Sequence, residues 1–158
     1  MANLTGLPEV FHGSTTDADS SAQVAVGTRA KDVNGNEYVY LRGTASTVAG
    51  NWVVYDLNVT NSNTKLAVAN DVGPLAVAGT ATTLNLYGWY QVYGKASAGN
   101  SGSVATTKAL YLTANAGYVD DADVAGDAIV GAYSMAGSSG SATTVWLNYP
   151  FVHDIAID

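Results

Sequence analysis

Short runs of alternating apolar and polar residues recur along the chain, with turn-forming residues between them. The alternation has the two-residue period of a strand with one buried face. It is clearest in residues 51–59, where Val53, Tyr55, Leu57 and Val59 share one face. Strands this short, separated by turn signals, predict an all-β fold, either an antiparallel β-sandwich or a small β-barrel.

A hairpin is the clearest local prediction. Residues 23–31 and 37–42 flank the segment DVNGN, whose Asn34-Gly35 pair suits a two-residue turn that needs positive φ at both positions. The same letters resemble a calcium loop. However, a calcium loop of the EF-hand type has its glycine at the sixth position and helices on both sides, whereas Gly35 is at the fourth position here. The hairpin is therefore favoured over a metal site.

Residues 84–98 are apolar or aromatic on both faces. Such a strand lies in the centre of a fold, or it turns one face to a partner. Further strands are expected at residues 109–113, 129–135 and 145–152, and two short ones within residues 65–83. Together these segments form a β-domain over residues 23–158, either as one unit or as two packed lobes, residues 23–98 and 99–158.

Residues 1–22 show neither helical nor strand periodicity and are expected to form an extended N-terminal arm. The segment is either a frayed terminus or an arm that becomes ordered on a partner. It holds isolated apolar residues that cannot form a core of their own. The second interpretation makes these residues the contact with the partner: Leu4, Leu7, Val10 and Phe11.

Charge limits the possible partners. The 158 residues include 13 Asp and Glu but only 6 Lys and Arg, giving a net charge of −7. Nucleic-acid binding needs a basic surface, so we expect no nucleic-acid partner. The same argument excludes an anionic membrane surface, and no apolar run reaches the roughly 20 residues of a membrane span. The chain has no Cys, which excludes disulfides and thiolate metal sites.

Catalytic motifs are absent from the sequence. The two histidines, His12 and His153, lie near opposite ends of the chain, and no serine sits in a G-x-S-x-G turn. No phosphate-binding loop is present either. We therefore expect a protein that is not an enzyme, with no catalytic residue, no cofactor and no metal. The acidic segment with Asp120, Asp121, Asp123 and Asp127 is interpreted as a solvated turn, with calcium binding as the alternative and paired carboxylates for sugar hydrolysis as a weaker one.

The aromatic residues allow three interpretations: a core with its rim, a platform for stacking carbohydrate, or a protein interface. The core is favoured for most of them. Under the interface interpretation, the residues at the contact between copies are Tyr87, Trp89, Tyr93 and Trp146.

Three stretches resemble the capsid decoration (cement) proteins of tailed bacteriophages. They are residues 25–46 (AVGTRAKDVNGNEYVYLRGTAS), residues 87–98 (YGWYQVYGKASA) and the run from Lys108 that ends in TTVWLNYPFV. Their order along the chain, more than any one motif, carries the resemblance.

The resemblance implies a structural protein of the virion that is assembled in the host cytoplasm and binds the outer surface of the phage head. Its partner would be the major capsid protein, and such proteins commonly form homotrimers that clamp neighbouring capsid subunits. The expected effect is head stabilisation, because a protein that binds only the expanded shell stabilises it by its binding free energy. The alternative is a carbohydrate-binding β-module that uses exposed Trp and Tyr, so that host glycans would be its ligands.

Overall fold

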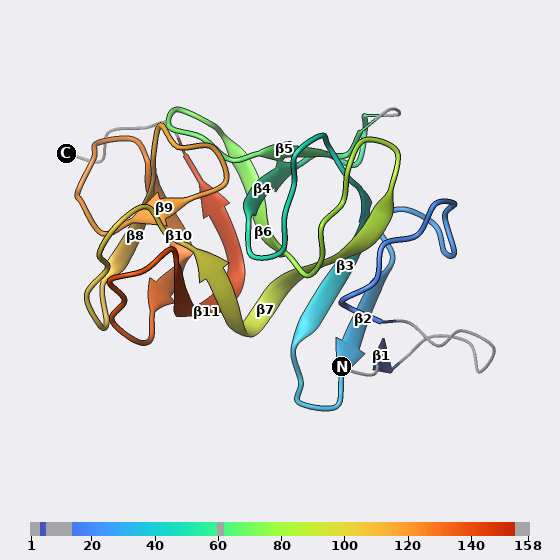
Figure 1. Cartoon of the computed structure of the whole chain (residues 1–158), viewed down its shortest axis with the longest axis horizontal. Helices are drawn as coiled ribbons and strands as arrows, with labels where there is room; N and C mark the ends of the chain where they lie inside the picture. The colour runs from blue at the N-terminus through green and yellow to red at the C-terminus, as the bar shows by residue number, and fades with distance from the viewer. Residues whose placement is uncertain (1–3, 6–13, 60–61, 154–158) are drawn as a thin grey trace.

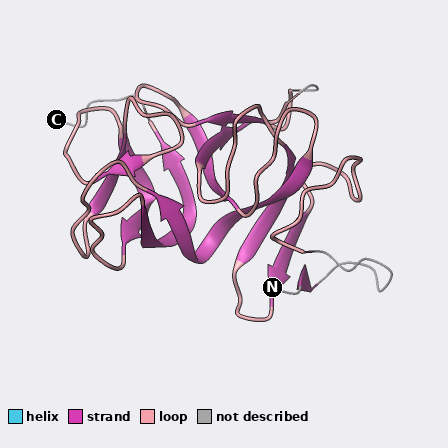
Figure 2. Cartoon of the chain, viewed as in Figure 1, coloured by secondary structure: helices cyan, strands magenta, loops and turns pink. Residues whose placement is uncertain are grey.

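The structure, a computed structural model, describes residues 4–5, 14–59 and 62–153. These residues form strands, turns and loops without a helix, which confirms the all-β prediction (Figure 2). In the described part of the chain there is accordingly no apolar helix of membrane-spanning length. The strands are β1 (Leu4–Thr5), β2 (Arg29–Asp32), β3 (Glu37–Arg42), β4 (Trp52–Tyr55), β5 (Thr64–Leu66), β6 (Gly73–Ala78), β7 (Tyr87–Gly99), β8 (Ala109–Leu112), β9 (Val119–Asp120), β10 (Ala128–Ser134) and β11 (Ala142–Val152).

The named strands pair antiparallel in one 11-stranded sheet. Its main path runs β1-β2-β3-β7-β6-β11-β10-β8-β9, and β4 joins β6 and β5 as a branch. The sheet is not closed into a barrel, which is consistent with the sandwich alternative.

β7 connects the two sides of the molecule. Its first half pairs with β3 and β6, and its second half pairs with β11 from Tyr93 to Gly99. Figure 1 shows this strand running from the side that holds β2 and β3 towards the side that holds β8 to β11. Most of its side chains are buried, so the prediction of a central strand is confirmed.

The core is shared between the two halves of the chain. β4 and β6 direct alternate side chains into two different apolar clusters. Trp52, Leu75 and Val77 belong to the largest cluster, which also holds Ala96, Leu110 and other residues up to Val152. The residues next to them, including Val53, Ala76 and Ala78, belong to a second cluster with Tyr90. Since the largest cluster draws on both sides of position 98, the two predicted lobes have a common core.

The third cluster lies where β3 meets the start of β7 and contains Tyr40 and Trp89. It also fixes a segment that the sequence placed in the arm. The Tyr40 hydroxyl donates a hydrogen bond of 2.6 Å to the Asp19 carboxylate, and the backbone of Asp19 bonds twice to Tyr87. Asp19, within the predicted arm, therefore contacts the β-domain, and the arm boundary at residue 22 stays a prediction.

The predicted hairpin is present, with Arg29 opposite Val39 and Lys31 opposite Glu37. Its turn differs from the prediction. Gly35 has a positive φ of 82°, but Asn34 does not, and the Gly35 N–H bonds to the Asp32 carbonyl. This is a three-residue loop with one left-handed glycine, not a two-residue primed turn.

Residues 51–59 form a shorter strand than their alternation predicts. β4 ends at Tyr55, and the Asp56 carboxylate accepts a hydrogen bond from the Asn58 N–H, which starts a turn. Leu57 and Val59 are consequently exposed, whereas Val53 and Tyr55 occupy the predicted core face.

Candidate functional site

Two of the predicted interface residues lie in contact on an outward face of the sheet. The rings of Tyr93 on β7 and Trp146 on β11 meet edge to face, with centroids 5.5 Å apart. The Tyr149 ring also contacts that of Tyr93, with centroids 5.5 Å apart and the planes tilted by 32°. Tyr133 on β10 is the cross-strand partner of Trp146. We call these four residues the aromatic face: Tyr93, Tyr133, Trp146 and Tyr149.

Strand register sets the direction of these side chains. Residues directly opposite each other in antiparallel strands point to the same side of the sheet. One row crosses β10, β11 and β7 as Tyr133, Trp146 and Lys95. The neighbours of Trp146 along its strand, Val145 and Leu147, point inwards and are fully buried. The buried core beneath therefore holds the aromatic face on rigid strands.

Tyr149 reaches the face through an irregularity in the strands. The pairing of β10 with β11 shifts between Val130 and Ala132, where Gly131 has a φ of 82°. Opposite this bulge Tyr149 has a φ of 49°. A bulky residue in the left-handed region carries backbone strain, and such strain is concentrated at functional sites. Tyr149 remains 49% exposed, so core packing does not account for it.

A polar network borders the aromatic face. The Tyr149 hydroxyl donates a hydrogen bond of 2.5 Å to the Glu37 carboxylate, and Lys31 Nζ lies 2.7 Å from the same carboxylate. The hydrogen bonds from Lys31 and Tyr149 lower the pKa of Glu37 below its ordinary value, whereas the bond to Glu37 raises the pKa of Tyr149. The Arg29 guanidinium lies 5.8 Å above the ring of Tyr149.

The other two predicted interface residues lie elsewhere. Trp89 is only 1% exposed and packs against Tyr40, so it is a core residue and presents no surface to another copy. Tyr87 is half-buried at the rim of the same cluster, where its ring stacks on Tyr40. Tyr87 and Trp89 thus lie in the third cluster, whereas Tyr93 and Trp146 lie half-buried on an outward face of the sheet.

The predicted arm contacts lie almost entirely outside the described residues. Leu7, Val10 and Phe11 are in the undescribed segment. Leu4 belongs to β1, whose backbone pairs with Asp32 and Lys31 of β2. Their role in contacting a capsid stays a prediction.

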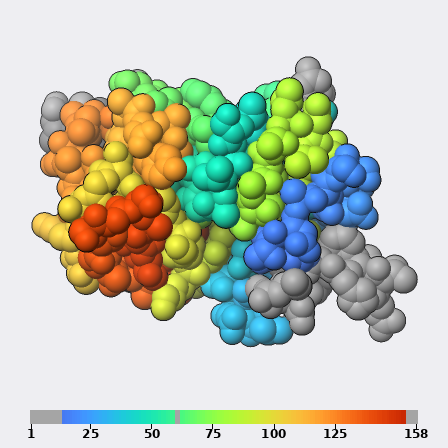
Figure 3. Space-filling model, viewed as in Figure 1, coloured from blue at the N-terminus to red at the C-terminus, as the bar shows by residue number. Residues whose placement is uncertain are grey.

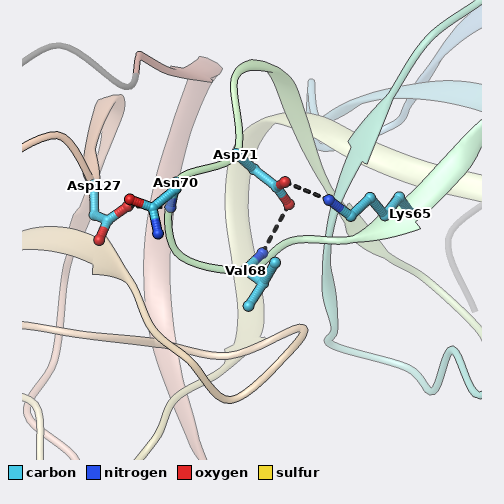
Figure 4. Close-up of polar contacts among 5 residues, drawn as sticks. All are labelled: Lys65, Val68, Asn70, Asp71 and Asp127. Carbon is cyan, nitrogen blue, oxygen red and sulfur yellow. Dashed lines mark hydrogen bonds and ion pairs between the residues drawn. The ribbon is translucent and has the colours of Figure 1, made fainter.

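The carboxylates of the acidic segment have separate partners. Asp121 accepts a hydrogen bond from the Ala105 N–H, and Asp120 accepts one from the Ala122 N–H. Asp127 is buried and accepts a 2.6 Å hydrogen bond from the Asn70 N–H, which ties β10 to the loop after β5 (Figure 4). In residues 14–59 and 62–153 there is no group of three acidic or histidine side chains that could hold a metal ion.

In the hairpin segment that resembles a calcium loop, the carboxylate of Asp32 has a structural role. Asp32 is buried and accepts hydrogen bonds from the N–H groups of Asn34 and Asn36, from the Asn36 amide and from the Tyr38 hydroxyl. These four hydrogen bonds hold the carboxylate inside the hairpin, where it stabilises the turn.

A cleft of about 520 Å³ is lined by strand and loop residues from both halves of the chain. The segments that line it meet near the middle of the surface shown in Figure 3. Its walls are mainly glycine, alanine and valine, with hydroxyl and amide groups from Tyr38, Asn51, Gln91 and Ser141, and no charged side chain. The amides of Asn51 and Gln91 bond to backbone carbonyls, so these groups are already satisfied.

Sequence reasoning missed Tyr133 and Tyr149. Alternation along the predicted strand 129–135 would place Tyr133 on the same face as Ile129, but Ile129 is buried and Tyr133 is exposed, because the bulge at Gly131 shifts the alternation. The direction of Tyr149 depends on the same bulge, whose glycine lies 18 positions away in the sequence.

The aromatic face offers ring surfaces and hydroxyls, and the network at its border adds charged groups. This arrangement is suited to binding a ligand or a partner. Comparison with protein-family models, with curated proteins and with solved structures gives no match to this chain.

Proposed function

We propose that this chain is a structural binding protein that decorates the outer surface of a tailed-phage head and stabilises the expanded shell by contacting the major capsid protein. The observation that carries the proposal is the aromatic face, a sheet surface on which a single chain leaves Tyr133 and Tyr149 exposed beside the half-buried Tyr93 and Trp146. Exposed apolar surface of this kind marks interaction sites. The sequence resemblance over residues 25–46, 87–98 and 108–152 supplies the phage context.

In this proposal two parts of the molecule have different tasks. The N-terminal arm contacts the capsid through Leu4, Leu7, Val10 and Phe11. Tyr93 and Trp146 join copies of the chain into a homotrimer. An arm that becomes ordered on the capsid loses conformational entropy, but it can span two subunits.

The test is sedimentation of the protein with tailed-phage heads that lack their own decoration protein, together with light-scattering mass. Deleting residues 1–13 is expected to abolish co-sedimentation and to leave the fold intact, because the only described element that it removes is β1, a two-residue strand at the edge of the sheet. A Val10→Ser/Phe11→Ser variant keeps β1 and serves as the matched control for loss of that strand. Failure of the full chain to bind any head would refute the decoration role.

The second candidate is a carbohydrate-binding module. The observation in its favour is that Tyr133 and Tyr149 are 41% and 49% exposed and flank the half-buried Trp146 and Tyr93, so that several ring surfaces lie together. Sugar rings stack their C–H faces on such rings, because an aromatic face carries partial negative charge. A Trp146→Ala variant that binds an immobilised glycan array as well as the parent protein would exclude this candidate.

A further inference from the structure

Positive charge gathers beside the aromatic face. The chain has six Lys and Arg residues, and three of them, Arg29, Lys31 and Lys95, lie on or next to this surface. The acidic groups nearby are Glu37, which Lys31 and Tyr149 engage, and Asp56, which lines a shallow pocket with Arg29. A third carboxylate, that of the buried Asp32, is hydrogen-bonded to Asn36, which in turn accepts a hydrogen bond from the Lys95 backbone. The three cations are therefore balanced in number by three carboxylates, and the charge that a ligand on the aromatic face would meet first is that of Lys95.

Lys95 is the cation best placed to meet a ligand. It is the cross-strand partner of Trp146, so its side chain leaves the sheet on the same side as the indole. Lys95 is exposed, and among the described residues it takes part in no ion pair. A negative group on a ligand that stacks on Trp146 would come within reach of its ammonium group.

We propose that the aromatic face binds an acidic sugar chain, with a sugar ring stacked on the surface of Trp146 and Tyr93 and its carboxylate received by Lys95. This inference rests on the carbohydrate-binding candidate function and adds the charge class of the ligand. The exposed Asn148, opposite Tyr93, supplies an amide for the sugar hydroxyls.

Single-stranded nucleic acid also combines negative charge with flat rings. A site that binds the phosphate backbone of nucleic acid needs a continuous cationic groove. Here one lysine, Lys95, lies in the row with Tyr133 and Trp146, and the carboxylate of Glu37 lies among the other cations. The acidic sugar fits this sparse charge better. Nucleic acid is therefore included in the test as a competing ligand.

The experiment measures binding of the full chain to an oligogalacturonate, to its methyl-esterified form and to a single-stranded oligonucleotide of the same charge. The two sugars share their rings and linkages, and the ester differs in carrying an uncharged methyl ester in place of each carboxylate. We expect the acid to bind at least about tenfold more tightly than the ester, and this preference to shrink as salt is raised. Trp146→Ala is expected to abolish binding of the acid.

The decisive variant is Lys95→Gln, which is expected to reduce the preference for the acid over the ester. The matched control is Lys108→Gln, which removes an exposed lysine directly before β8 and is expected to leave this preference unchanged. Thermal unfolding of each variant checks the fold. Equal binding of acid and ester would overturn the charge inference but keep the carbohydrate function. Binding of neither sugar would overturn both. Tighter binding of the oligonucleotide than of either sugar would overturn the proposal and assign the aromatic face to nucleic acid. A molecular mass that rises with protein concentration in the parent but stays that of a monomer in Trp146→Ala would overturn it and assign the face to a second copy of the chain.

Discussion

At the scale of single residues, Tyr149 has three connected properties. Its backbone lies in the left-handed region, its ring contacts that of Tyr93, and its hydroxyl bonds to Glu37. The strained backbone turns the ring onto the aromatic face, and the hydrogen bond holds it there. The local structure thus fixes the direction of an exposed side chain, which lowers the entropy that binding must overcome.

The contact between Tyr149 and Glu37 predicts a pH dependence of stability. The pKa of Glu37 is lowered, so its contribution is present above the ordinary glutamate pKa and is lost as pH falls through the lowered value. The pKa of Tyr149 is raised, so the contact is lost again as pH rises through that value. Tyr149→Phe should therefore reduce the free energy of unfolding equally between about pH 5 and pH 9.

Because both groups are near the surface, the loss for Tyr149→Phe should be at most about 1 kcal/mol. Urea denaturation at a series of pH values gives the measurement, with Glu37→Gln as the matched variant. In very acidic solution the difference between the parent and Tyr149→Phe should shrink, because a protonated carboxyl accepts a weaker hydrogen bond than a carboxylate does. A difference that is the same in very acidic and in neutral solution would contradict a charge-assisted bond to Glu37.

At the scale of elements, the bulge between β10 and β11 positions the face. A Cβ on Gly131 would lie 2.5 Å from the Asn148 carbonyl oxygen, and its φ of 82° is one that side chains rarely adopt. Bulges redirect side chains and are features of the fold, not defects.

Gly131→Ala is therefore expected to be more destabilising than Gly102→Ala by at least about 1 kcal/mol, because both substitutions strain φ but only the first adds a backbone clash. Gly102 has a similar φ of 94° and nothing within 4 Å of an added Cβ. Equilibrium denaturation compares the two variants, and near-ultraviolet circular dichroism follows the aromatic rings. Equal destabilisation would show that the strands relax around the new methyl group.

The sequence predicts a structural feature well when the feature depends on neighbouring residues, and poorly when it depends on residues far away in the chain. Alternation placed Val53 and Tyr55 on one face, and both occupy the second cluster. The same rule failed at Leu57, because the turn formed by Asp56 ends β4 early. The aromatic face brings together Tyr93 and Trp146, which are far apart in the chain, and a periodicity cannot report a pairing over that distance.

At the scale of the whole molecule, the shared core predicts cooperative unfolding. The largest cluster joins Trp52 and Leu75 with Leu110 and Val145, so neither half can bury its apolar side chains alone. We expect one thermal transition with equal calorimetric and van't Hoff enthalpies.

Leu110→Ala should cost about 2–5 kcal/mol and lower the stability reported by probes in both halves. Leu41→Ala, in the second cluster, is the matched truncation on the other side of the sheet. Two resolved transitions, with Leu110→Ala affecting only one of them, would instead show that residues 23–98 and 99–158 fold as separate lobes.

The length of β7 has a mechanical consequence. Its 13 residues would extend for about 40 Å and are hydrogen-bonded to β3 and β6 at one end and to β11 at the other. A pull that separates the two sides along this strand loads each ladder in shear, so that many hydrogen bonds resist together instead of opening one after another. If the protein were anchored at both sides, the tension between the anchors would pass through the continuous backbone of β7.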